Sequence, residues 1–127
     1  MNDPANRPRH WRFVAAIFVV LILVLSLWPS SALRPLLEMP GFHTGGAHFL
    51  GYAALAWLVS HGWPLQPLGR MWVAVCVLGL LVELAQIPVP GRGFQWSDVL
   101  VNAAGALLGA SVALATRRKA WNGSRPS

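Results

Sequence analysis

The sequence predicts an all-α integral membrane protein, a bundle of four transmembrane helices joined by short loops, with both termini in the cytoplasm. Of its 127 residues, 55% are hydrophobic and only 11% are charged. Its apolar residues form four runs, and its basic residues lie mostly in the segments next to these runs. A soluble domain carries about a quarter charged residues, so this chain lacks the polar side chains that would cover a globule. One cysteine also excludes a disulfide scaffold.

The four apolar runs cover residues 13–28, 47–63, 71–87 and 99–116. A helix needs about 20 mostly apolar residues to cross the hydrocarbon core, so each run is close to the minimum length. Tryptophan prefers the headgroup level, and the tryptophans at or near the predicted helix ends are Trp11, Trp28, Trp63, Trp72, Trp96 and Trp121. We therefore expect a transmembrane domain at 13–116 between basic tails at 1–12 and 117–127.

The basic residues predict the orientation, because Lys and Arg are retained on the cytoplasmic side of a membrane. The tails and the second loop hold most of them, while Arg34 and Arg92 lie in the first and third loops, residues 29–46 and 88–97. Both termini should then be cytoplasmic, with these two loops outside. Positive residues at helix ends, with no continuous basic face, favour a lipid bilayer with anionic lipids as the partner over nucleic acid.

The first run has an alternative interpretation as a secretory signal, because it follows basic residues and precedes the small residues Ser30 and Ala32. That interpretation would leave three spans. Its apolar stretch is at or beyond the length of a signal core, and Trp28 and Pro29 occupy the expected cleavage region. We therefore expect the segment to be retained, mainly as an anchor.

Polar residues inside the last three runs are the candidates for function, because a polar group in hydrocarbon is costly. Together with a loop arginine, they form the predicted ligand-binding set, which is His48, Tyr52, Glu83, Gln86, Arg92, Asp98 and Asn102. Within each helix these residues are three or four apart, so they share a face, and all lie in the outer half of the predicted topology. We expect the three faces to meet in one outward site.

Small residues continue the same face of the last helix. Gly105 and Gly109 form a G-x-x-x-G pair, which allows two helices to approach closely. We expect this pair to serve helix packing within the bundle, with a dimerisation seam as the alternative. The oligomeric state is not predicted.

The third loop holds Arg92 between two glycines, after prolines at residues 88 and 90. Arg92 is expected between Glu83 and Asp98, and two interpretations follow. It either forms a salt-bridged plug over the bundle, or it receives a phosphate or carboxylate together with the amino terminus of the last helix.

A catalytic role is the runner-up. His48 could act as acid or base with Glu83 and Asp98 as partners, although the chain has no recognised nucleophile motif. These three residues could in principle also bind a metal, but ligands gathered from three helices have no diagnostic spacing, so neither a metal nor a cofactor is predicted. An enzyme is therefore less expected than a binding protein.

The spacing of these motifs resembles the VanZ-like family of small bacterial membrane proteins. The resemblance rests on E-x-x-Q at residues 83–86, Pro-Gly-Arg at 90–92, D-x-x-x-N at 98–102 and G-x-x-x-G at 105–109, preceded by His-Phe-Leu-Gly-Tyr at 48–52. It covers residues 47–110, about half of the chain. Family members often carry Asp-Lys shortly before the histidine, where this chain has Thr44 and Gly45.

The resemblance implies a multi-pass protein of the bacterial cytoplasmic (inner) membrane, and the family's namesake is associated with low-level resistance to teicoplanin. We therefore expect the outward site to bind an anionic cell-envelope ligand, namely a lipid headgroup, a lipid-linked precursor or a glycopeptide antibiotic, and to modulate antibiotic susceptibility. The third interpretation is a non-catalytic structural subunit of the membrane.

Overall fold

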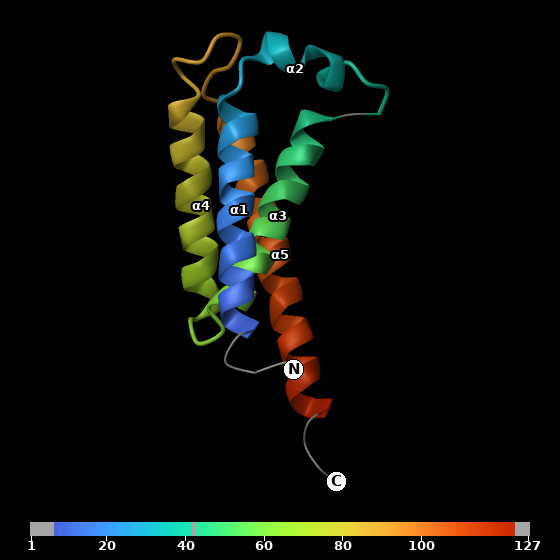
Figure 1. Cartoon of the computed structure of the whole chain (residues 1–127), viewed down its shortest axis with the longest axis vertical. Coiled ribbons are helices and arrows are strands. Elements are labelled where there is room, and N and C mark those ends of the chain that lie inside the picture. The colour runs from blue at the N-terminus through green and yellow to red at the C-terminus, as the bar shows by residue number, and fades with distance from the viewer. Residues whose placement is uncertain (1–6, 42, 124–127) are drawn as a thin grey trace.

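The computed structural model describes residues 7–41 and 43–123, and this part of the chain is entirely helical. It contains five helices: α1 (Arg7–Leu27), α2 (Ser30–Leu37), α3 (Thr44–Gly62), α4 (Leu68–Ala85) and α5 (Trp96–Gly123). The four long helices run side by side, and α2 lies across one end of the bundle (Figure 1). The prediction of an all-α protein is confirmed.

Among the described residues, three helices are long and apolar enough to cross a membrane, through Pro8–Leu27, Leu68–Ala85 and Trp96–Lys119. The fourth predicted span corresponds to α3, which has 19 residues but is less apolar because it contains His48, Ser60 and His61. Its central residues are buried against other helices, as Leu55 and Ala56 are fully inaccessible. Three of the four predicted spans thus correspond to described helices with the length and hydropathy to cross a membrane, and α3 is not one of them.

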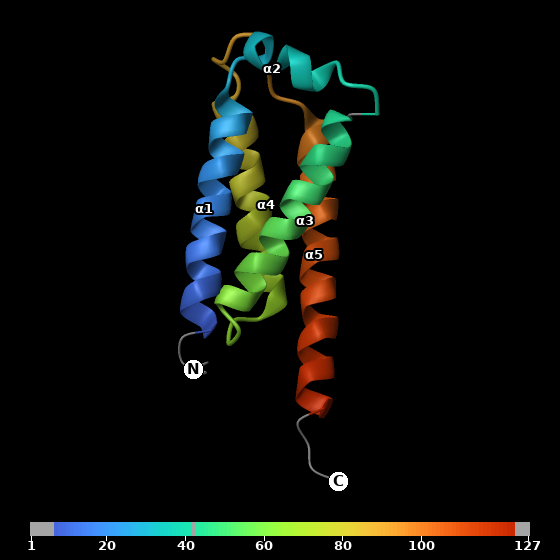
Figure 2. The same cartoon turned by 45° about the vertical axis from the view of Figure 1, so that its right-hand side comes forward.

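Helix α2 was not predicted, since residues 29–46 were expected to form a loop. Helix α2 begins directly after Pro29, and Pro35 lies inside it. Pro29 is the N-cap, where a missing N–H costs no helical hydrogen bond, whereas Pro35 removes one from the helix interior. Helix α2 lies over the end of the bundle that carries the predicted polar site (Figure 2).

The most extensive packing in the bundle is between α3 and α5. A Cβ atom on Gly105 would lie 2.2 Å from the carbonyl oxygen of Phe49, and one on Gly109 would lie 1.9 Å from that of Ala53. Both separations are far below van der Waals contact, so only glycine allows this approach. This contact fixes the position of His48 on α3 relative to Asp98 on α5.

In contrast, α1 packs against the bundle with few of its residues buried. Its buried residue is Ala15, while large apolar side chains along it, including Phe13, Ile17 and Val20, are exposed. Trp11 near its start packs edge-on against Trp57 of α3, with ring centroids 5.2 Å apart. An exposed apolar surface of this kind requires lipid around it.

Candidate functional site

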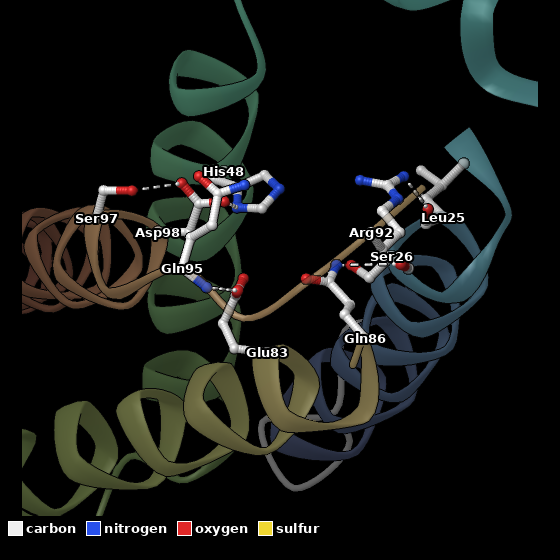
Figure 3. Close-up of polar contacts among 9 residues, drawn as sticks. All are labelled: Leu25, Ser26, His48, Glu83, Gln86, Arg92, Gln95, Ser97 and Asp98. Atoms are coloured by element: carbon white, nitrogen blue, oxygen red, sulfur yellow. Dashed lines mark hydrogen bonds and ion pairs between the residues drawn. The ribbon is translucent and has the colours of Figure 1, made fainter. Parts of the chain in front are cut away.

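One cluster of polar side chains joins three helices at the end of the bundle below α2. His48 of α3, Glu83 of α4 and Asp98 of α5 each offer a ligand atom, and these atoms lie within 4.8 Å of one another. Figure 3 shows the three side chains converging from different helices. We call these three residues the His–carboxylate cluster.

Within this cluster Glu83 is the deepest residue, with no exposed surface. Its Oε2 accepts a hydrogen bond from the backbone N–H of Gln95 at 3.3 Å, while its Oε1 is buried with no hydrogen-bond partner in the described part of the chain. Nδ1 of His48 lies 4.0 Å from Oδ2 of Asp98, and these side chains are 20% and 25% exposed. The cluster is therefore closed on the Glu83 side and accessible on the other.

Tyr52 and Asn102, two further residues of the predicted site, both lie against Gly79. A Cβ atom on Gly79 would be 3.1 Å from the Tyr52 ring and 3.4 Å from Cβ of Asn102, so the glycine gives them room. The hydroxyl of Tyr52 and both polar atoms of the Asn102 side chain are buried, with no hydrogen-bond partner among the described residues. Such groups are costly unless they have a partner, so each of them calls for a partner such as a water molecule, an ion or a ligand.

Arg92 does not lie between the two carboxylates, so the expected Glu83–Arg92–Asp98 plug is wrong. Its guanidinium donates instead to the carbonyl oxygens of Leu25 at 3.1 Å and Trp28 at 3.3 Å. Gln86 also points to α1, because its amide donates to the carbonyl oxygen of Ser26 at 3.0 Å. These carbonyls at the end of α1 have no partner within the helix, and a cation stabilises that end of the helix dipole.

The helical repeat explains why the site is divided in two. Residues three apart on a helix differ by about 60° in direction, and this difference is enough to aim Glu83 at α3 and α5 while Gln86 faces α1 (Figure 3). Gly91 adopts φ of +73°, and a Cβ atom there would lie 1.9 Å from Oγ of Ser30. A side chain at residue 91 would therefore clash with Ser30, and the backbone N–H of Ser30 donates to the carbonyl oxygen of Pro90 at 3.4 Å, which joins the loop to the start of α2.

An apolar cavity of about 190 Å³ lies between α1, α2 and α3. His48, Tyr52 and Arg92 of the predicted site line it, whereas Glu83 and Asp98 are not part of its lining. The wall is otherwise mainly aliphatic and aromatic, and it includes Phe18, Leu21, Ile22, Leu25, Leu33 and Leu36. The cavity thus combines an apolar wall with a few polar groups, as ligand sites usually do.

This fold and site define a small α-helical membrane protein with one polar end. A family model described as VanZ/LLP1 matches residues 11–117, and the chain therefore belongs to the VanZ/LLP1 family. No curated protein and no solved structure matches the chain. The family resemblance inferred from the sequence motifs is confirmed, over a longer part of the chain than those motifs cover.

Sequence reasoning missed the contributions of α1 and α2 to the site. The carbonyls of Leu25, Ser26 and Trp28 are backbone groups, and no residue type marks them. The α2 wall did carry a signal, since Leu33, Leu36 and Leu37 follow the three-four spacing of an apolar helix face. Two prolines and a charged pair obscured that pattern.

Proposed function

We propose that this VanZ/LLP1-family protein binds an anionic lipid of the cell envelope, with the phosphate of the headgroup at Arg92 and part of one acyl chain in the cavity. The observation that carries the proposal is the position of a guanidinium at the edge of an apolar cavity of about 190 Å³. The lipid is either an anionic phospholipid or a lipid-linked precursor, since both have a phosphate and a hydrocarbon chain.

The size of the cavity supports a lipid over a glycopeptide. Pockets that enclose a whole small ligand have volumes of about 300–1,000 Å³, so a cavity of about 190 Å³ holds only part of one. A lipid fits this condition, because the rest of its hydrocarbon can remain in the bilayer. The exposed apolar face of α1, beside the cavity, provides the continuous path that such a chain needs.

The charge of the site supports an anionic headgroup. Arg has five N–H donors in a planar fork, and two N–H groups of Arg92 are engaged by α1 carbonyls. The remaining donors are suited to phosphate oxygens, to which Arg binds strongly. His48 and Tyr52 also line this cavity, while the two carboxylates of the cluster lie outside its lining.

The membrane arrangement is part of this proposal. We place the protein in the bacterial inner membrane as a multi-pass protein, with α3 as a fourth span enclosed by α1, α4 and α5 and with both termini cytoplasmic. The cavity then opens to the outer leaflet, where lipid-linked wall precursors are used. Binding of such a precursor would alter susceptibility to glycopeptide antibiotics that recognise it.

Native mass spectrometry of the purified protein tests the proposal with phosphatidylglycerol as the probe. We expect retained lipid with the wild-type protein and at least a tenfold weaker retention with Gly51→Leu, because Gly51 lines the cavity and has open space at its Cβ position. Gly69→Leu is the matched control, since Gly69 also has open space there but lies on α4, away from the cavity. Equal retention by both variants would contradict the cavity as the site.

An acid–base enzyme is the second candidate, and the 4.0 Å separation of His48 Nδ1 and Asp98 Oδ2 favours it. In such an enzyme His48 would transfer a proton to or from the bound lipid, with Asp98 orienting its ring. His48→Gln should then abolish the chemical conversion of the lipid. A binding protein would retain the lipid without converting it. A purely structural subunit would neither retain nor alter it.

A further inference from the structure

We propose that the His–carboxylate cluster binds one divalent metal ion of the first transition row, such as Zn²⁺ or Mn²⁺. The proposal does not depend on lipid binding, because Glu83 and Asp98 lie outside the lining of the lipid cavity. The sequence alone did not predict a metal, since the three residues have no diagnostic spacing. The fold brings the three side chains close together, which their spacing in the sequence could not indicate.

The three donor atoms lie slightly farther apart than the ligands of one bound metal ion. Imidazole nitrogen and carboxylate oxygen bind Zn²⁺ at about 2.0–2.2 Å, so two ligands of one ion are at most roughly 4.4 Å apart. The donor atoms of His48, Glu83 and Asp98 lie within 4.8 Å of one another. The largest separation therefore exceeds that limit only slightly, and the three side chains must draw closer together to bind one ion.

The second observation is the state of Glu83. This carboxylate has no exposed surface, its Oε1 has no hydrogen-bond partner in the described chain, and the same is true of Nδ1 of His48. A buried carboxylate oxygen without a partner is among the most costly arrangements in a protein. A metal ion at the cluster would provide a partner to both unpaired atoms.

Charge supports a divalent ion over other occupants. Two carboxylates share the cluster, and the nearby Arg92 is directed to α1 carbonyls instead of pairing with them. One nitrogen and two oxygen donors suit Zn²⁺, Mn²⁺ or Fe²⁺ better than the softer ions that prefer thiolate. Three protein ligands also leave a coordination position open, on the side where His48 and Asp98 are partly exposed.

Metal binding is tested with the full-length protein in detergent, purified with a tag that contains no histidine. After treatment with EDTA, titration with Zn²⁺ alone should show one ion bound per chain, by calorimetry and by elemental analysis after desalting. Glu83→Gln and Asp98→Asn should each weaken binding by at least about 100-fold, since loss of outer-shell partners alone costs 10–100-fold. Glu38→Gln is the matched control, because Glu38 is an exposed carboxylate at the C-cap of α2.

A second variant covers the case in which the cluster substitutions fail to fold. His48→Cys keeps a metal ligand at the same position, and Co²⁺ bound to it should show a thiolate charge-transfer band that the wild-type protein lacks. The wild-type protein is the reference for this measurement, because it contains Cys76 but no cysteine at residue 48. Absence of Zn²⁺ binding by the folded wild type, or equal binding in Glu83→Gln and Glu38→Gln, would overturn the proposal.

Discussion

Nη2 of Arg92, in the loop between α4 and α5, donates a hydrogen bond to the carbonyl oxygen of Leu25 near the end of α1, across a sequence separation of 67 residues. This contact joins α1, the least buried of the four long helices, to the loop above the polar site. The same side chain lines the apolar cavity. One arginine therefore has both a structural role and the proposed ligand role, and the two can be separated by substitution.

Replacing Arg92 with Gln should lower the free energy of unfolding by about 1.5–3 kcal/mol, the range for hydrogen bonds to a charged group, with a further contribution from the helix dipole. Arg92→Lys should recover part of this stability, because the charge at the end of α1 is kept. Lipid retention should remain low in both variants, since lysine lacks the planar fork. Thermal unfolding in detergent and lipid retention measure the two effects.

Arg34→Gln is the control for loss of one positive charge at the same end of the bundle. Arg34 forms an exposed pair with Glu38 at 3.4 Å, and exposed pairs contribute about 0–1 kcal/mol. A loss of stability or of lipid in Arg34→Gln as large as in Arg92→Gln would show that general surface charge, not the placement of Arg92, is responsible.

Gly109→Ala should separate α3 from α5 and destabilise the protein by about 1–3 kcal/mol, the usual cost of forcing extra atoms into a packed contact. The added methyl group would meet the carbonyl of Ala53. Gly69→Ala, with open space at the same position, should be neutral or stabilising, because alanine favours helix by about 1 kcal/mol. Equal melting temperatures for the two variants would contradict the close contact of these helices.

Tyr52→Phe should leave the free energy of unfolding unchanged or raise it by about 1 kcal/mol. The buried hydroxyl has no hydrogen-bond partner in the described chain, so nothing offsets the cost of removing it from water. Lipid retention should stay unchanged, because the hydroxyl is fully buried and phenylalanine keeps the ring in the cavity wall. A clear loss of stability in this variant would instead indicate that the hydroxyl has a structural partner.

The long helices were predictable because each is a long apolar run bounded by tryptophan, proline or charge. The convergence of His48, Glu83 and Asp98 was also predictable in outline, because each lies near the same end of its helix. The different directions of Glu83 and Gln86 could not be predicted, since both residues lie on one broad face of α4. Only the positions of the neighbouring helices α1 and α5 decide which contacts each side chain makes. The partner of Arg92 could not be predicted, because backbone carbonyls at a helix end are the same for every sequence.

The membrane topology is open to direct measurement. Reporter fusions after residue 127 should be active in the cytoplasm, and a cysteine replacing Arg34 should react with a membrane-impermeant reagent from outside. Arg34 is suited to this because it is 74% exposed on α2. A periplasmic carboxy terminus would mean that α3 does not cross the membrane together with α1, α4 and α5.

The central claim is that a lipid chain occupies the cavity between α1, α2 and α3, and photocrosslinking tests it most directly. The protein would be reconstituted with phosphatidylglycerol that carries a diazirine in its acyl chain, irradiated and digested. We predict that crosslinks concentrate on cavity residues such as Phe18, Ile22 and Leu33 and decrease in Gly51→Leu. Crosslinks spread evenly over exposed apolar residues outside the cavity, such as Phe13, Val77 and Leu107, and unchanged by Gly51→Leu, would contradict it.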